Sequence, residues 1–311
     1  MKKRYFCVIV IQVHNNKPFG AKIIKKLFTA AAALVIAMPM SAATFQEVNG
    51  FIKAKKWSEA ETSCRKLISN VKTEKDRFNA YMKLMMIMRR LNKNAELVKD
   101  ADAFLANCKD DNQAAELLIF KGIGQRAVKQ SAESLETFKL AVDKAKDGRA
   151  AREAACYFID TAPGLKKHAE AQEMYVRAAK FQGSDKDARL HLAASFAYWD
   201  NNKMQEASAI LDKAEKIENM STIYKEMYLR YRGTLLHRTG KYEEAVKHFD
   251  QALTLKLTDY CVGRLNFFKA QSLEKLNKNQ EAVAAYKAAL EYKGSAYFKG
   301  AAQRAVKKLE K

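Results

Sequence analysis

The chain has 311 residues, of which 56 are Lys or Arg and 35 are Asp or Glu, so its formal net charge is +21. Nearly half of the residues (48%) are hydrophobic, and this excludes an intrinsically disordered chain. The chain holds only 3 Pro and 12 Gly. A β-rich protein of this length needs more turn residues, so the composition favours long charged helices, in one elongated domain or two globular ones.

The first 43 residues differ in character from the rest of the chain. They hold seven basic residues and no acidic one, and an uncharged run at 27–40 follows Lys25-Lys26. With the small residues Ser41-Ala42-Ala43 after it, this arrangement is typical of a secretory signal peptide. We therefore predict an exported protein, periplasmic or secreted after cleavage behind Ala43. The run would make only about 21 Å of helix, so an uncleaved membrane anchor is the less favoured alternative.

The basic flank of this leader is unusually long, because residues 5–13 add a second apolar run. Either translation begins further in, near Val8, Val10 or Val13, or the leader carries an extension without function. Removing residues 1–43 takes away seven of the 56 basic residues and none of the 35 acidic ones, which leaves the mature chain at +14.

An internal repeat covers the rest of the chain. Its pattern is a small residue, a bulky apolar residue four positions later and a second small residue three positions after that. Ala245, Phe249 and Ala252 form the best copy. Side chains three and four positions apart share one face of a helix, so each copy predicts a helix that packs closely on a neighbour. The copies begin, at steps of 36–38 residues, with Ala60, Leu97, Ser134, Ala171, Ala207, Ala245 and Ala282.

A repeat of about 37 residues has room for two helices and two short turns. We expect the second helices at 57–70, 94–107, 131–146, 168–181, 204–217, 242–255 and 279–292. The first helices are expected between them, for example at 74–91, 112–128, 186–200, 222–239 and 260–276. Thr73 with Asp76, and Ser184 with Asp187, resemble capping boxes at two of these starts. Segment 293–311 is expected to cover the open end of the stack with a last helix at 295–310.

The unit at 225–257 resembles a tetratricopeptide repeat. In the first helix, Leu229 stands at the bulky position, Gly233 at the glycine position and Leu236 at the tyrosine position of the family pattern. In the second helix, Phe249 and Ala252 match directly. The resemblance implies an all-α, right-handed α-solenoid of about seven helix-turn-helix repeats over 44–292, closed by the C-terminal capping helix.

The chain also departs from the family pattern. The family period is 34, whereas this chain repeats at about 37. Leu257 stands where Pro is usual, and Arg232 stands where Leu is usual. The Sel1-like repeat family, with a period nearer 36, is the alternative, although its extra Gly-rich turns are not evident.

The sequence shows no motif for catalysis or metal binding. The four Cys of the mature chain are widely spaced without a Cys-x-x-Cys pair, which is unlike a metal site or a thiol oxidoreductase. Motifs of zinc proteases, serine hydrolases and phosphate-binding loops are absent. We predict a protein that is not an enzyme and that needs neither cofactor nor metal.

Two residue types allow a structural and a functional interpretation. We expect Cys64 to be a buried apolar residue at the bulky position of its repeat, and a disulfide with Cys108 in the next repeat is the alternative. In the Met-rich stretch 82–88, we expect Met85 and Met88 to fill the core rather than to form an adaptable binding surface.

In the tetratricopeptide family, the first helices line a concave face that commonly holds a partner peptide or helix, and the resemblance implies the same face here. Arg binds carboxylates in a bidentate manner and aromatic rings anchor apolar side chains, so we expect a protein or peptide partner with acidic or carboxylate-bearing segments. The alternative is a solvated Arg face, with Trp199 packed on the next unit. Carrying over the groove positions gives Arg189, Phe196, Trp199, Arg230, Thr234, His237, Arg264, Phe267 and Gln271, and spacing alone adds Arg89 and Arg126.

Three functions stay open at this point. The first is an exported scaffold that binds a protein or peptide partner in the bacterial cell envelope. The second is a basic surface module for an anionic polymer or a membrane surface, with peripheral membrane contact at most. Nucleic acid is disfavoured by export and by few aromatic-basic motifs. The third is an enzyme of unrecognised type.

Overall fold

The computed structural model describes residues 43–292 and 296–310. The predicted signal peptide lies outside the described residues except for Ala43, and so do residues 293–295 at the start of the predicted capping segment. Within the described residues the chain is all-α, with fifteen α-helices and two 3₁₀ helices. The prediction of the fold class is confirmed.

The helices form seven helix-turn-helix pairs, α2–α3 to α14–α15, and a last helix α16 that packs on α15. The 3₁₀ helices η1 (Ala162–Leu165) and η2 (Ser184–Lys186) precede α9 and α10. In chain order the α-helices are α2 (Phe45–Lys53), α3 (Trp57–Asn70), α4 (Glu74–Arg90), α5 (Asn94–Leu105), α6 (Asp111–Ala127), α7 (Ser131–Lys144), α8 (Gly148–Thr161), α9 (His168–Ala178), α10 (Ala188–Asp200), α11 (Met204–Glu215), α12 (Thr222–Arg238), α13 (Tyr242–Leu253), α14 (Asp259–Lys275), α15 (Asn279–Glu291) and α16 (Ala296–Leu309).

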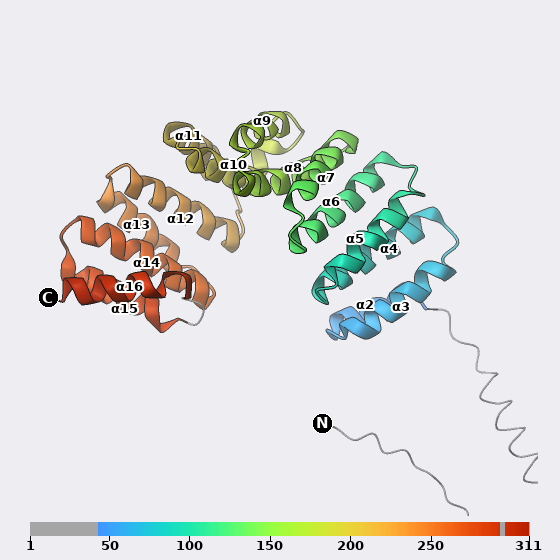
Figure 1. Ribbon diagram of the computed structural model, residues 1–311, viewed down its shortest axis with the longest axis horizontal. Coiled ribbons are helices and arrows are strands. Elements are labelled where there is room, and N and C mark those ends of the chain that lie inside the picture. The colour runs from blue at the N-terminus through green and yellow to red at the C-terminus, as the bar shows by residue number, and fades with distance from the viewer. Residues whose placement is uncertain (1–42, 293–295, 311) are drawn as a thin grey trace, which may run out of the picture.

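The pairs stack side by side into an arch (Figure 1). From α4 to α14, each first helix contacts the first helix of the next pair, whereas the second helices pack mainly on the first helices beside them. In a curved stack the helices that lie closest together are on the inner side. The first helices therefore line the concave face, as the resemblance implied.

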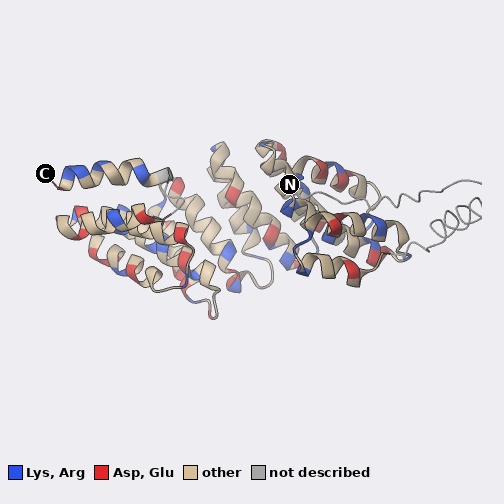
Figure 2. Ribbon diagram, turned by 90° about the horizontal axis from the view of Figure 1, so that it is seen from below, with Lys and Arg blue, Asp and Glu red and all other residues tan. Residues whose placement is uncertain are grey.

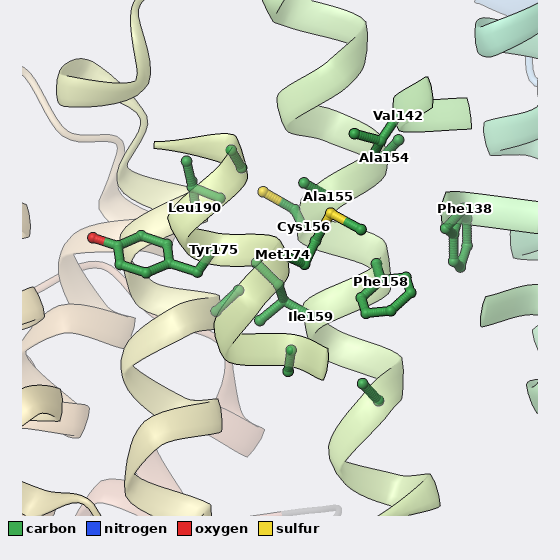
Figure 3. Close-up of a cluster of buried hydrophobic side chains, with 14 of the residues drawn as sticks. Phe138, Val142, Ala154, Ala155, Cys156, Phe158, Ile159, Met174, Tyr175 and Leu190 are labelled. Carbon is green, nitrogen blue, oxygen red and sulfur yellow. The ribbon is translucent and has the colours of Figure 1, made fainter. Parts of the chain in front are cut away.

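The aromatic residue of the second helix fits against a glycine of the first helix. A Cβ atom added at Gly122 would lie 2.5 Å from the ring of Phe138, and one added at Gly233 would lie 2.7 Å from the ring of Phe249. Both rings are fully buried. Around Phe138 the core continues through Phe158 of α8 to α9 and α10 (Figure 3). The small-bulky-small pattern is thus a packing pattern between the two helices of a pair.

The turn between the paired helices has the same conformation in every repeat. One residue in each turn has a positive φ, and it always lies five positions before the first small residue of the pattern. Only one of the seven is a glycine, so this conformation could hardly be predicted from the residue types. The seven residues are Lys55, Asn92, Lys129, Lys166, Asn202, Gly240 and Asn277.

Side chains cap most first helices but none of the second helices that are described with an N-cap. Thr73 caps α4 as predicted, because its Oγ1 accepts from the backbone N–H of Asp76 at 3.0 Å. The predicted cap at Ser184 is wrong. Ser184 lies in η2, and Asp187 caps α10 through a bond from the N–H of Leu190 at 3.0 Å.

Cys64, Met85 and Met88 lie in the core, as expected from the sequence. The thiols of Cys64 and Cys108 are both free, so the structure does not support the alternative of a disulfide between them. Cys64 is fully buried and its Sγ donates to the carbonyl of Ala80 at 3.2 Å. Met85 and Met88 are fully buried, which confirms their assignment to the core.

Candidate partner-binding surface

Two of the predicted arginines lie over the same tyrosine ring. The guanidinium carbons of Arg126 in α6 and Arg189 in α10 are 5.4 and 4.0 Å from the ring centre of Tyr157 in α8. Arg189 also lies 3.7 Å from a carboxylate oxygen of Asp160, whereas Arg126 donates to the hydroxyl of Thr161 at 3.4 Å. The stack joins three consecutive first helices, and Arg126 forms no ion pair within the described residues.

Phe196 and Trp199 of α10 form an aromatic cluster with Tyr231 of α12. The ring centres are 5.6 to 6.1 Å apart, in edge-to-face and tilted arrangements. Phe196 stays 37% exposed, although its ring is large and apolar. Arg238 of α12 covers the Trp199 ring at 4.7 Å. The aromatic cluster therefore presents a rigid apolar surface beside a positive charge.

Arg230 and Arg264, by contrast, share one buried carboxylate. Nε of Arg230 lies 2.9 Å and Nη2 of Arg264 lies 3.1 Å from Oε1 of Glu226. Glu226 is 3% exposed and Arg230 is 8% exposed. A buried carboxylate needs such partners, because an unpaired charge is costly away from water. The two arginines thus stabilise the α12–α14 interface, and the predicted role in carboxylate capture is not what their positions favour.

His237 and Thr234 are also engaged within the protein. Nδ1 of His237 lies 2.9 Å from Oγ of Ser272 on α14. Burial lowers the pKa of His237, and the nearby charges of Lys275 and Arg238 lower it further. The imidazole is therefore neutral at neutral pH. The Thr234 hydroxyl donates to the carbonyl of Arg230 at 2.7 Å.

Phe267 and Arg89 lie at opposite ends of the concave face. Phe267 packs against the rings of Phe298 and Tyr286, at 5.2 and 5.8 Å between ring centres, so it belongs to the core below α16 and is not an anchor in the groove. Arg89 is exposed on α4, and its guanidinium lies 5.8 Å above the ring of Phe120. Gln271 is half-buried on α14.

Four residues in or beside this surface were not predicted from the sequence: Tyr157, Glu226, Tyr231 and Arg238. A signal was present for two of them. Arg89 above Phe120 and Arg126 above Tyr157 are the same contact one repeat apart, since Arg126 follows Arg89 by 37 positions and Tyr157 follows Phe120 by 37 positions. Glu226 precedes Arg230 by four positions, which is the spacing of an ion pair along a helix.

Three cavities lie where first helices begin. One of about 410 Å³ is lined by α4, α5 and α6, and two of about 740 and 860 Å³ lie around the segments before α10 and α12. Among the predicted partner-binding residues, Arg189 lines the 740 Å³ cavity. The described part of the chain contains no group of three or more His, Cys, Asp or Glu placed to hold a metal ion. In the same part, no helix has the length and apolar character to cross a membrane.

Comparison with known proteins supports the assignment from packing. Residues 227–259 and residues 263–295 each match a family model described as tetratricopeptide repeat. Stacked helix pairs with a glycine-aromatic contact, together with these two matches, define a tetratricopeptide-type solenoid. The described chain therefore has a tetratricopeptide-like solenoid fold, and its last two pairs carry the sequence pattern of the tetratricopeptide repeat family. A search of the curated proteins finds no match.

Solved structures share the fold at low sequence identity. A tetratricopeptide repeat protein from Parabacteroides merdae aligns with a TM-score of 0.59 at 14% identity, over 86% of this chain and 97% of its own. The C-terminal part of a repeat protein from Cytophaga hutchinsonii aligns with a TM-score of 0.52 at 14% identity, over 80% of this chain and 95% of its own. The apo form of RapI gives a TM-score of 0.55 at 12% identity, over 85% and 97%. At these identities the similarity shows the fold alone.

Proposed function

We propose that this protein is an exported scaffold whose concave face binds a protein partner, with the aromatic cluster of Phe196, Trp199 and Tyr231 as the anchor. The exposed Phe196 ring is the observation that carries this proposal. Aromatic side chains held in a fixed arrangement lose little freedom on binding, and such residues supply most of the affinity at protein interfaces.

The charges on this face refine the expected partner. Arg230 and Arg264 share the single carboxylate of Glu226, and Arg189 lies beside Asp160. The arginines of the first helices that form no ion pair within the described residues include Arg89, Arg126 and Arg238. Arg89 and Arg126 lie on α4 and α6, before the aromatic cluster along the arch, and Arg238 lies against its Trp199 ring. We therefore expect a partner segment with an apolar or aromatic residue and acidic residues beside it.

The substitution that tests this proposal is Phe196→Asp. It places a charge in the aromatic cluster without removing a buried side chain, and Val176→Asp is the matched control, because Val176 is 53% exposed on the second helix α9. Each protein is used as bait in an envelope extract, and captured proteins are quantified by mass spectrometry. Loss of the same partner with Phe196→Asp but not with Val176→Asp supports the proposal. Equal capture by both variants would falsify it.

Export is a separate part of the proposal and rests on the sequence of the leader. The helix α2 begins next to the predicted cleavage point, and Thr44 caps it by accepting from the N–H of Glu47 at 3.2 Å. Cleavage after Ala43 leaves this cap in place. N-terminal mapping of the protein from the producing cell should find Thr44 as the first residue. A mature protein that keeps residues 1–43 in the cytoplasm would contradict export.

A further inference from the structure

A cavity of about 410 Å³ opens between α4, the end of α5 and the start of α6. We call it the α4–α6 cavity. Its volume lies within the range of small-molecule sites, which is about 300 to 1,000 Å³. None of the predicted partner-binding residues lines it, and it is separate from the aromatic cluster on α10 and α12. A ligand for this cavity would be a function beyond the scaffold.

Aromatic side chains form the apolar part of the cavity wall. The rings of Tyr81 in α4 and Phe104 in α5 are stacked nearly parallel, with an interplanar angle of 13°. Phe78 and Leu117 complete the apolar lining. This wall favours a ligand with a flat ring, because a planar group can stack on the face of an aromatic side chain or contact its edge.

Charged side chains of both signs lie around the same cavity. Arg77 and Lys109 are basic, and Glu74 is acidic; none of the three forms an ion pair within the described residues. Asp110 also lines the cavity, but its carboxylate is engaged, since Oδ1 accepts from the N–H of Gln113 at 2.8 Å. The cavity therefore offers two free cations and one free carboxylate beside an aromatic wall.

We propose that the α4–α6 cavity binds an aromatic residue that carries a free carboxylate, either as an aromatic amino acid or as the C-terminal residue of a peptide. The ring packs on Phe78, Tyr81 and Phe104. The carboxylate pairs with Arg77, with the positive charge of Lys109 beside it, and the ammonium or amide N–H of the ligand meets Glu74. An apolar ligand without charge would leave all three charged groups without a partner, and a polyanion would be repelled by Glu74 and Asp110.

Isothermal titration calorimetry on the full chain tests this proposal with four probes. L-Phenylalanine and the peptide Gly-Gly-Phe carry ring and carboxylate, phenylalanine amide lacks the carboxylate, and L-leucine lacks the ring. At least one of the first two should bind, and the amide and leucine should bind about tenfold more weakly or not at all. Tighter binding of phenylalanine identifies the free amino acid as the source, and tighter binding of the peptide identifies a chain end.

Substitutions locate the binding in the cavity. Arg77→Gln should weaken the better probe about tenfold, because a charge-assisted bond to the carboxylate is lost. Lys99→Gln is the matched control, since Lys99 is exposed on α5 and does not line the cavity. No heat of binding with either phenylalanine or the peptide up to about 10 mM would overturn the proposal. Equal binding of the amide, or an unchanged affinity of Arg77→Gln, would overturn it as well.

A second readout uses a thiol of the cavity wall. Cys108 lines the cavity and is half-buried, and burial raises the pKa of its thiol, so alkylation by iodoacetamide is followed at alkaline pH. Cys261 on α14 is also half-buried and is the control within the same chain. The bound probe should slow alkylation at Cys108 and leave Cys261 unchanged. Equal rates at Cys108 with and without a probe that binds would place the binding elsewhere and contradict the proposal.

Discussion

The contact between a glycine of the first helix and the aromatic ring of the second is the smallest unit of this fold. Ser134 adds to it in the third pair, because its Oγ donates to the carbonyl of Gly122 at 2.8 Å. No larger side chain fits at the glycine, since the ring lies within 3 Å of where a Cβ would stand. The absence of a single Cβ atom at the glycine therefore determines how closely the paired helices pack.

Gly233→Ala should lower the free energy of unfolding by about 1–3 kcal/mol, because the added methyl group forces the buried Phe249 ring to move. Gly50→Ala is the control, since nothing lies within 4 Å of a Cβ at this exposed helical position, and alanine there should stabilise by up to about 1 kcal/mol. Urea denaturation of both variants measures the difference. Similar changes for the two would show that the ring contact is not tight.

Glu226 holds two guanidinium groups at the α12–α14 interface, and its loss leaves them without a counter-ion. Glu226→Gln should lower the free energy of unfolding by about 3 kcal/mol. The control Asp143→Asn breaks the exposed pair with Arg177, where both side chains are over 40% exposed, and should cost less than about 1 kcal/mol. If both variants lose the same stability by denaturant unfolding, Glu226 is not the interface residue described above.

One buried histidine, His191, and two half-buried ones, His237 and His248, should make the protein less stable in acid. Burial lowers the pKa of His191, His237 and His248 below the ordinary value of 6.5. The unfolded chain therefore binds more protons than the folded chain just below pH 6.5, so stability falls as the pH decreases through this range. Urea midpoints at pH 7 and pH 5 measure the fall, and His191→Gln should reduce the difference between them. An unchanged difference would show that His191 does not contribute.

Single residues also explain where the sequence was informative and where it was not. Arg232 stands where the family has an apolar residue, and the sequence alone marked it only as a departure. In the structure Arg232 donates to Ser208 at 2.9 Å and pairs with Asp212, both on α11. Likewise, the sequence placed Arg230 and Arg264 on the right helices, but it did not show that Glu226 lies between them. Partners in other repeats are fixed by packing, which a linear pattern does not contain.

At the scale of the helices, the second helices were the most predictable elements. All seven begin at the residue expected from the sequence, because the small-bulky-small pattern and its period fix their position. The first helices lack such a pattern, and α10 begins at Ala188 rather than at 186, since η2 occupies the expected start. The positions of the inter-helix turns were predicted, but their left-handed backbone conformation was not, because lysine and asparagine carry most of the positive φ values.

The turn between α12 and α13 offers a test of this conformation. Gly240 has a φ of 81°, and nothing lies within 4 Å of an added Cβ. Gly240→Ala should therefore lower the stability by about 1 kcal/mol through backbone conformation alone, without a steric clash. Gly50→Ala serves again as the control in a helix. A Gly240→Ala protein as stable as the parent in urea would show that the turn relaxes without cost.

At the scale of the whole molecule, the arch distributes its charges rather than concentrating them. Basic and acidic segments alternate along the helices (Figure 2), and many are joined in ion pairs, such as Lys93 with Glu61 and Lys308 with Glu274. A surface for an anionic polymer needs a continuous basic stripe. The mixed distribution favours a protein partner instead, in agreement with the exposed aromatic cluster at the middle of the concave face.

The same scale shows why the site was harder to predict than the fold. The repeat period and the packing pattern were enough to predict seven helix pairs and a last helix, because each repeat contacts only its neighbours. Phe196 and Phe267 looked equivalent in the sequence. One is exposed at the middle of the arch, whereas the other is covered by Phe298 of α16. This difference depends on where the stack ends, and the repeat pattern does not show which side chains the last helix covers.

Photo-crosslinking from the concave face tests the proposed function most directly. A benzoylphenylalanine is introduced in place of Phe196 on α10 and, separately, in place of Val176 on α9, and both proteins are irradiated in the cell that produces them. We expect a crosslinked protein partner from position 196. From position 176 the same crosslink should be missing or much weaker. The same products from both positions, or products from position 176 alone, would contradict a partner bound to the concave face.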